Sequence, residues 1–366
     1  MEKRTLALIG ALILIAAAII VLTPLSPNRS FTGTAVAPGN RTAINAEKAK
    51  LYPYAKEIAE PSGFVNVDNI TIASLVGKDV ILVDFWTYSC INCERTIPYL
   101  NLWYSEYHDQ GLEIIGVHTP EFQFEHDINN VRMAVRKFGI QYPVVLDNNY
   151  ATWDSYGNQY WPEDYLVDID GFIVYHHIGE GDYNETEAEI QDLLRERAAA
   201  LGLNITISNT TSVPSDAVAV NFSAVGSPET YFGAARNQYL ANGNSSVTGL
   251  QTLVIPAQVQ LNGLYLSGTW DFADQYAENT GNASIVFPYE AKNVYFVASA
   301  DNATAVQVLL DGKPVTDLAG PDVTNGTVTI QADRLYSLVQ GSGYGTHTLE
   351  LDIPEPGLNA YTFTFG

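Results

Sequence analysis

Cys90 and Cys93 are the only cysteines among 366 residues, and their spacing could support thiol–disulfide chemistry. They follow an apolar, strand-like run over 80–86 and open a segment with a helical pattern over 94–109. A helix N-terminus stabilises a thiolate, so Cys90 is expected to be the attacking sulfur. Cys93 lies one helical turn further on and could close a small disulfide ring. The spacing predicts a redox-active dithiol that uses no bound cofactor.

Three other interpretations of the cysteine pair deserve comparison. A structural disulfide would close almost no loop and would stabilise the chain little. A zinc site needs four ligands, and the remaining candidates are six scattered histidines at 108, 118, 126, 176, 177 and 347, so no metal is predicted. A thiol peroxidase has the pattern Pro-x-x-x-Thr-x-x-Cys; Thr87 fits it, but Val83 stands at the proline position. The dithiol is favoured, with a peroxidase as a lesser alternative.

Asp84 lies six positions before Cys90, inside the apolar run. A carboxyl group buried there would have a raised pKa and could accept the proton that Cys93 loses during exchange. The alternative is an ordinary aspartate at a strand end, hydrogen-bonded to the backbone. Asp84 is therefore a candidate general base.

Trp161 and Pro162 precede a second apolar run, over 165–169. A thioredoxin fold places a cis-proline at the entrance of the strand opposite its redox site. The backbone there would pair with a substrate peptide, and Trp161 would form one wall of the groove. A trans proline in an ordinary turn remains an alternative.

The N-terminus resembles a membrane anchor. Glu2-Lys3-Arg4 precedes an apolar run from Leu6 to about Leu25, which is long enough for a marginal span of ~20 residues. The basic flank predicts that the bulk of the chain lies outside the cytoplasm. A cleaved signal peptide is the alternative.

Charge and sequons limit the partners. The net charge of -23 argues against nucleic acid and against anionic membrane surfaces. Eleven Asn-x-Ser/Thr sequons suggest a glycosylated exterior surface. With both cysteines in one motif, the chain has none left for structural disulfides.

Hydrophobic periodicity divides the chain. Alternating strands and helices over 61–203 predict an α/β sheet, with strands at 80–86, 112–117, 143–146, 165–169 and 172–178 and helices at 94–109, 127–138 and 185–201. Short alternating runs over 228–366 predict an all-β sandwich, with type I′ hairpin turns at Asp311-Gly312 and Asn325-Gly326. The complete prediction is an anchor (1–25), a tether with a short helix at 46–60 (26–60), an α/β domain (61–203), a linker (204–227) and a β-sandwich (228–366).

Four motifs in order carry a family resemblance: Val83–Cys93, Gly116–Phe122, Asn158–Pro162 and Gly179–Tyr183. Over residues 60–200 the chain resembles the TlpA-like thioredoxin-fold proteins, and most closely the extracytoplasmic part of the DipZ type. Residues 228–366 are similar to the family's trailing β-domain, which resembles a carbohydrate-binding module. DipZ-type proteins usually begin with a multi-span membrane domain, whereas this sequence has one apolar segment. The resemblance therefore implies a separate membrane electron donor of the CcdA type.

The resemblance also implies roles for single residues. Cys90 would be the nucleophile, Cys93 the resolving thiol, and Trp161-Pro162 the cis-proline platform. The remaining residues that the motifs bring in are candidates for lining the groove: Trp86, His118, Glu121 and Glu180.

Two functions of different classes follow. The first is a membrane-anchored thiol–disulfide oxidoreductase that acts on client proteins, preferentially as a reductase. The second is a surface binding protein whose β-sandwich engages a glycan or a protein. The second function requires a platform of exposed rings, for which the candidates are Tyr231, Tyr265, Trp270 and Tyr344.

Overall fold

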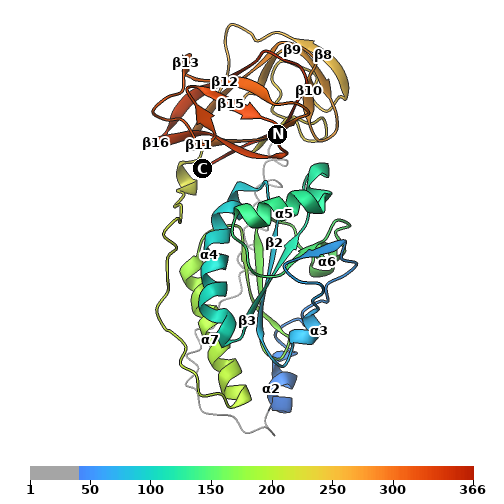
Figure 1. The fold of residues 1–366 in the computed structure, drawn as a ribbon, viewed down its shortest axis with the longest axis vertical. Helices are drawn as coiled ribbons and strands as arrows, with labels where there is room; N and C mark the ends of the chain where they lie inside the picture. The colour runs from blue at the N-terminus through green and yellow to red at the C-terminus, as the bar shows by residue number, and fades with distance from the viewer. Residues whose placement is uncertain (1–40) are drawn as a thin grey trace, which may run out of the picture.

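The structure, a computed structural model, describes residues 41–366 and shows two domains stacked along the long axis (Figure 1). We call the part from α2 to α7 the redoxin domain and the part from β7 to β17 the β-domain. The predicted anchor and the first part of the predicted tether lie outside the described residues. Between residues 41 and 366, no helix is both long and apolar enough to cross a membrane.

The redoxin domain contains a six-stranded sheet in the order β1-β4-β3-β2-β5-β6. Strands β2, β3 and β4 run parallel, and β1, β5 and β6 pair antiparallel to their neighbours. The five predicted strands are present. The bounds are β1 Gly63–Val65, β2 Val80–Trp86, β3 Leu112–His118, β4 Val144–Leu146, β5 Glu163–Val167 and β6 Ile173–Ile178.

Helices cover both faces of this sheet. The three predicted helices correspond to α4, α5 and α7, two of which begin two or three residues earlier than predicted. The bounds are α2 Arg41–Lys48, α3 Ile72–Leu75, α4 Ile91–Tyr107, α5 Ile128–Lys137, α6 Ala151–Tyr156 and α7 Tyr183–Leu201. The predicted helix at 46–60 is wrong in position, because the helix ends at Lys48.

Alternation along β2 sends its side chains into two separate cores. Leu82 and Trp86 belong to the core that also contains Cys93, on the face of α4 and α7, whereas Val83 and Phe85 belong to the opposite core. Every residue of β2 is buried. Asp84 therefore points to the same side as Leu82 and Trp86, toward the cysteine pair.

Helix α2 is held against the redoxin domain by ion pairs. Lys48 bonds to the carboxylates of Asp168, Asp170 and Glu196, and Arg41 also bonds to Asp170. The second half of the segment predicted as a tether is therefore folded onto the domain. The sequence pattern missed this docking because it depends on acidic groups more than a hundred residues away.

The β-domain is built from one antiparallel sheet. The strand order is β14-β15-β12-β16-β11-β17-β10-β9-β8, and β9 also pairs with β11, so part of the sheet closes on itself. The strands are β7 Thr230–Tyr231, β8 Gly249–Leu253, β9 Tyr265–Phe272, β10 Ala277–Asn279, β11 Ala283–Ala300, β12 Thr304–Leu310, β13 Lys313–Pro314, β14 Val323–Thr324, β15 Thr327–Ile330, β16 Arg334–Ile353 and β17 Leu358–Phe365. An all-β domain is confirmed; its likeness to a carbohydrate-binding sandwich stays a prediction.

The two predicted hairpin turns have the expected geometry. Asp311 and Gly312 have φ of 53° and 75°, and Asn325 and Gly326 have φ of 51° and 73°. Positive φ at both central residues is the requirement of a type I′ turn. The local turn chemistry was sufficient to predict these two hairpins.

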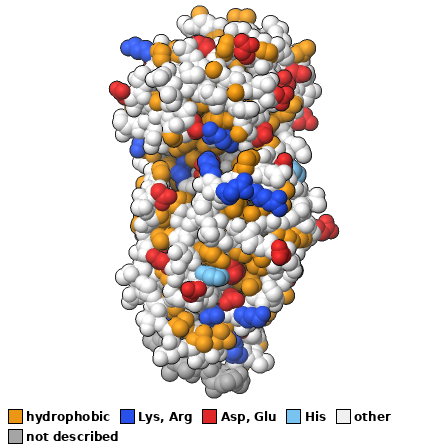
Figure 2. Space-filling view, viewed as in Figure 1, with side chains coloured by type: hydrophobic (Ala, Val, Ile, Leu, Met, Phe, Trp, Pro, Cys, Tyr) orange, Lys and Arg blue, Asp and Glu red, His pale blue; other side chains and the backbone are white. Residues whose placement is uncertain are grey.

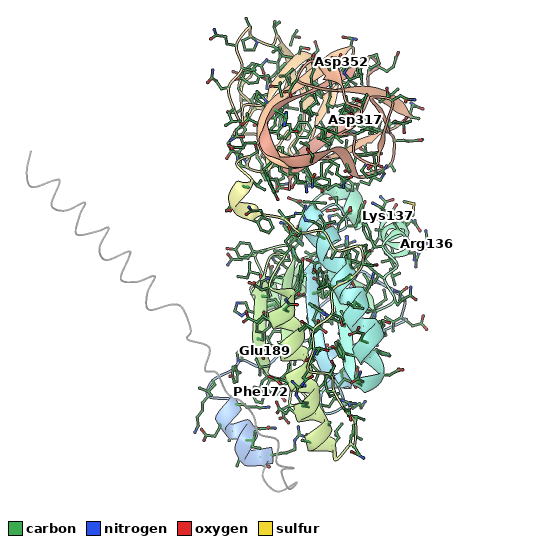
Figure 3. All side chains as sticks on the ribbon, turned by 90° about the vertical axis from the view of Figure 1, so that its left-hand side faces the viewer. Arg136, Lys137, Phe172, Glu189, Asp317 and Asp352 are labelled. Atoms are coloured by element: carbon green, nitrogen blue, oxygen red, sulfur yellow. The ribbon has the colours of Figure 1, made fainter. Side chains whose placement is uncertain are left out.

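The β-domain packs on the end of the redoxin domain that carries the cysteines (Figures 1 and 3). Ile91 and Phe122 are buried in one apolar cluster with Val297, Leu335 and Tyr361 of the β-domain. The Phe122 ring lies 5.1 Å from the Tyr361 ring, edge to face. Ile91 stands between the two cysteines, so the β-domain directly contacts the redox motif. We call this contact region the domain junction.

Charged side chains lie at the edge of the domain junction. On the face shown in Figure 2, Lys and Arg side chains gather where the two domains meet. Figure 3 places Arg136 and Lys137 at this level, far from Phe172 at the other end of the redoxin domain. Arg236 of the β-domain bonds to Glu121 of the redoxin domain at 2.6 Å. The junction therefore combines an apolar centre with polar contacts.

We predict that Phe122→Ala uncouples the two domains. Deleting a buried ring costs about 3 kcal/mol of unfolding free energy, and this ring contributes to both domains. Calorimetry should show the β-domain and redoxin-domain transitions separating. The matched control is Phe222→Ala, which deletes a ring that is 52% exposed and should leave the profile unchanged. An unaltered profile for Phe122→Ala would contradict the coupling.

Candidate active site

The cysteines lie where β2 passes into α4. Cys90 is the N-cap residue of α4, and its Sγ accepts a hydrogen bond from the Cys93 backbone N–H at 3.3 Å. Both are free thiols; Cys90 is half-buried and Cys93 is buried. Burial raises the pKa of the Cys93 thiol, and the neighbouring Cys90 and Asp84 raise it further. Cys90 is therefore the accessible sulfur, and Cys93 needs a base to become a thiolate.

Trp161 and Pro162 lie opposite Cys90. Their peptide bond is cis, as predicted, and Pro162 is buried at the start of β5. The Trp161 carbonyl oxygen lies 3.8 Å from the Cys90 Sγ. Its indole Nε1 donates to the Thr119 carbonyl at 3.0 Å, and its ring packs on Trp153 with centroids 4.4 Å apart. The structure thus brings together the two motifs that the sequence predicted to meet.

Asp84 is 1% exposed, and neither of its carboxyl oxygens has a hydrogen-bond partner among the described residues. The alternative of an aspartate bonded to the backbone therefore does not hold. Burial raises the pKa of Asp84, and the carboxyl group of Asp164 raises it further. The negative charge of Asp84 in turn raises the pKa of the Cys93 thiol. Asp84 has the environment that a proton acceptor for Cys93 requires.

Asp164 is a polar residue of this site that sequence reasoning missed. It is 4% exposed and lies directly opposite Asp84 in the β2–β5 pairing. Burial raises the pKa of Asp164 to about 7. A carboxyl group two residues after Pro162 at the start of an apolar run was an available signal. Its meaning depends on a strand register that the sequence does not reveal.

Two predicted groove residues are wrong. Trp86 and His118 are both fully buried, with rings 5.1 Å apart and edge to face. Burial lowers the pKa of His118 to about 3, so the imidazole is neutral, and its Nε2 lies 3.4 Å from the Thr87 hydroxyl. Side chains without solvent exposure cannot line a groove. They form the core beneath the turn that carries Cys90 and Cys93, which we call the cysteine turn.

The other two predicted groove residues are held in ion pairs. Glu180 bonds to Arg95 in the first turns of α4, and the two side chains are 5% and 3% exposed. Glu121 accepts hydrogen bonds from Tyr231 and Arg236 of the β-domain. Glu180 therefore stabilises the position of α4, and Glu121 contributes to the domain junction.

Glu125 is a second residue that the sequence analysis missed. Its buried carboxylate accepts four hydrogen bonds, from the Ser89 N–H at 3.3 Å, the Ser89 hydroxyl at 2.6 Å, and the N–H groups of Glu121 and Phe122 at 2.6 and 2.8 Å. Burial nevertheless raises the pKa of Glu125 to about 7. Glu125 joins the residue before Cys90 to the loop that enters the domain junction.

The four rings proposed as a binding platform do not form one. Trp270 and Tyr265 are 0% and 5% exposed and belong to the β-domain core or its edge. Tyr231 is half-buried beneath Arg236, whose guanidinium lies 3.7 Å from the ring centroid. Tyr344 is half-buried, and its hydroxyl accepts a hydrogen bond from the Asn221 N–H. Burial in the core removes the surface that stacking on a sugar requires.

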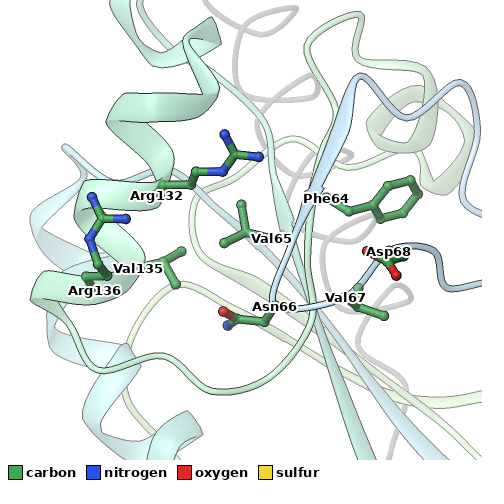
Figure 4. Close-up of a pocket in the computed structure, with 8 residues that line it drawn as sticks. All are labelled: Phe64, Val65, Asn66, Val67, Asp68, Arg132, Val135 and Arg136. Carbon is green, nitrogen blue, oxygen red and sulfur yellow. The ribbon is translucent and has the colours of Figure 1, made fainter.

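Two other features lie away from the cysteines. Within residues 41–366, the one cluster of carboxylates with metal-like spacing is Asp168, Asp170 and Glu196, and Lys48 forms ion pairs with all three. A pocket of about 450 Å³ lies between β1 and α5, lined by Phe64, Val65, Asn66, Val67, Asp68, Arg132, Val135 and Arg136 (Figure 4). Neither feature includes a residue of the cysteine site.

Two family profiles match consecutive parts of the chain. The AhpC/TSA family matches residues 55–176, and the family described as "Thioredoxin like C-terminal domain" matches residues 227–366. The gap between the two matches, 177–226, contains α7 and the segment that connects the domains. The order of the two family matches agrees with the two-domain architecture.

Relatives share this sequence over different lengths. Protein DipZ of Mycobacterium tuberculosis is 39% identical over 317 residues, which cover 85% of this chain and 43% of that protein. The thiol-disulfide oxidoreductase ResA of Halalkalibacterium halodurans is 33% identical over 131 residues, covering 36% of this chain and 70% of its own. A crystal structure of a thiol-disulfide isomerase from Corynebacterium glutamicum matches at 20% identity with a TM-score of 0.36, over 40% of this chain and 97% of that one. The chain thus spans less than half the length of DipZ.

Fold and site together define a thioredoxin-like protein with a cysteine pair at the N-terminus of a helix. A half-buried thiol faces a cis-proline, and a buried thiol faces a buried carboxyl group. Given the identity with ResA and DipZ, the chain belongs to the thioredoxin-like thiol–disulfide oxidoreductase family, with a DipZ-type β-domain at its C-terminal end.

We predict that Glu125→Gln changes the pH dependence of stability. Because the folded state raises the pKa of Glu125 from 4.5 to about 7, it binds more protons than the unfolded state between these pH values. This group therefore lowers wild-type stability as pH rises through that window, by roughly 1 kcal/mol per pH unit. The free energy of unfolding of the wild type should therefore fall relative to that of the variant from pH 4.5 to 7.

Urea denaturation at several pH values measures this difference. The exposed Glu355→Gln provides the matched control and should give a curve parallel to the wild type. If the Glu125→Gln curve is also parallel, the assignment of a raised pKa is incorrect.

Proposed function

We propose that the chain is a thiol–disulfide oxidoreductase that exchanges disulfides with client proteins outside the cytoplasm. The observation that carries the proposal is the position of Cys90. Its half-buried Sγ caps a helix and lies 3.8 Å from the carbonyl oxygen of the cis Trp161–Pro162 peptide, while Cys93 is buried behind it. This arrangement separates an attacking sulfur from a resolving sulfur.

The reaction in the reducing direction has two steps. The Cys90 thiolate attacks a client disulfide, forming a mixed disulfide and releasing the first client thiolate. Cys93 then loses its proton to Asp84 and attacks the Cys90 sulfur, which releases the second client thiolate and leaves the Cys90–Cys93 disulfide. The backbone of Trp161, at the cis peptide bond, would pair with the client backbone during both steps.

Resemblance to TlpA-like proteins supports the reducing direction. A reductase must be re-reduced, and we propose a separate membrane protein of the CcdA type as the electron donor. The apolar run at 6–25 with its basic flank supports a membrane anchor and an extracytoplasmic location. The β-domain would then position the enzyme near its clients; the burial of Trp270 and Tyr265 leaves a glycan site without its predicted platform.

We predict different losses for the two cysteine substitutions. Cys90→Ser should reduce dithiothreitol-dependent insulin reduction to the level of the buffer alone, because the attacking sulfur is gone. Cys93→Ser should retain the first step and accumulate a mixed disulfide with insulin, visible on a non-reducing gel. Insulin reduction by Cys90→Ser at the wild-type rate would exclude the mechanism.

The direction of electron flow can be read from the reduction potential of the Cys90–Cys93 pair. We expect a value near or below about -230 mV, the range of thioredoxin and glutaredoxins, from equilibration with glutathione or dithiothreitol buffers. A value near about -120 mV, as in strongly oxidising family members, would instead indicate a disulfide donor.

A further inference from the structure

A row of residues crosses the redoxin sheet beneath the cysteine turn. Strand pairing aligns Gly116 of β3 with Asp84 of β2, Asp84 with Asp164 of β5, and Asp164 with His177 of β6. Residues directly opposite in neighbouring strands point to the same face, with antiparallel partners' Cβ atoms about 5 Å apart. Two acidic side chains therefore lie next to each other on the face that packs against Cys93.

Neither acid is neutralised by the described chain. Both oxygens of Asp84 and Oδ1 of Asp164 are buried without a hydrogen-bond partner. Two adjacent carboxylates in a desolvated site would repel each other strongly and would lack donors. One proton held between them removes a negative charge and supplies the missing hydrogen bond. The geometry alone thus favours a singly protonated pair.

The groups around the pair add no permanent positive charge. Cys93 of α4 and Tyr142, which precedes β4, face Asp84; Tyr175 and His177 of β6 and Glu163 of β5 lie beside Asp164. Burial raises the pKa of Tyr142, and its hydroxyl, which is buried without a partner, stays neutral. The Nε2 atom of His177 is likewise buried and unpaired within residues 41–366.

Gly116 allows the enclosure of Asp84. A Cβ atom at this position would lie 2.9 Å from Nε1 of Trp86 and 3.1 Å from Cε2 of Tyr142. With hydrogen in its place, both rings approach the backbone of β3 next to Asp84. The rings exclude water from the carboxyl group, which strengthens its interaction with Asp164.

We propose that Asp84 and Asp164 act as one proton-sharing carboxyl pair, in which Asp164 is the positioning residue that keeps Asp84 basic enough to deprotonate Cys93. The proposal rests on the proposed thiol–disulfide exchange and extends it to a residue of a second strand. A single buried carboxylate hydrogen-bonded to a neutral donor would be a weaker base. The negative charge shared with Asp164 makes a second proton easier to accept.

The resolving step conserves protons and electrons. The singly protonated pair takes the proton of the Cys93 thiol and becomes doubly protonated and neutral. The Cys93 thiolate forms the bond to the Cys90 sulfur, the bond between Cys90 and the client sulfur breaks, and the client leaves as a thiolate. The pair then returns one proton to solvent or to the departing thiolate, and no further oxidant or reductant takes part.

Asp164→Asn tests the positioning role. The rate of mixed-disulfide resolution should fall about tenfold at pH 7 and approach the wild-type rate as pH rises, because hydroxide then deprotonates Cys93 directly. The double variant with Asp84→Asn should be no slower than Asp84→Asn alone, since Asp164 acts only through Asp84. The matched control is Glu187→Gln, a buried carboxyl group of α7 that accepts a hydrogen bond from Tyr107 and lies outside the pair, and its pH profile should match the wild type.

A titration without turnover separates this proposal from the proposed function. In the full chain with ¹³C-labelled aspartate, the carboxyl carbons of Asp84 and Asp164 should titrate in two linked steps in the wild type. Asp84 should titrate in a single step at lower pH in Asp164→Asn. An unmoved Asp84 midpoint, or multiplicative losses in the double variant, would overturn the pair, even if insulin is reduced. Linked titration in a protein that reduces no disulfide would support the pair and refute the proposed function alone.

Discussion

Desolvation of strand β2 is the constraint on which the site depends. All seven of its residues are buried, and one of them is ionisable. Because the strand has an apolar core on each side, Asp84 cannot reach water, and its charge is expensive unless a proton or a partner compensates it. Cys93 is 1% exposed and belongs to the same core as Leu82 and Trp86. Asp84 and Cys93 therefore share one environment from which water is excluded.

A second constraint acts from outside the redoxin domain. The β-domain covers Ile91, and its Tyr361 ring packs against Phe122 and Phe124. Glu125 connects this loop to Ser89, immediately before Cys90. The cysteine turn is thus supported from beneath by the core and from the side by a loop that the β-domain contacts. The two domains form one structural unit around the redox motif.

Local patterns predicted the parts of the site that depend on neighbours in sequence. The cysteine pair at a helix start and the proline at the entrance of β5 follow from spacing within short segments, as do the two type I′ turns. Trp86 and His118 were misplaced because membership of a motif does not say which face a residue occupies. Strand alternation from the buried Leu82 would have placed Trp86 in the core. The role of Asp164 depends on the register of two strands, and that of Glu125 depends on the folding of a loop. The domain junction depends on the docking of two surfaces. None of these features can be predicted from short segments of sequence.

The buried position of Ile91 bears on which disulfides can be reached. Here, one side of Cys90 is occupied by the chain's own second domain, and the Trp161 side is left for an incoming sulfur. Steric exclusion by the β-domain, more than any attractive contact, would then select the client. A disulfide on a flexible segment would reach Cys90, whereas a disulfide set in a broad folded surface would not.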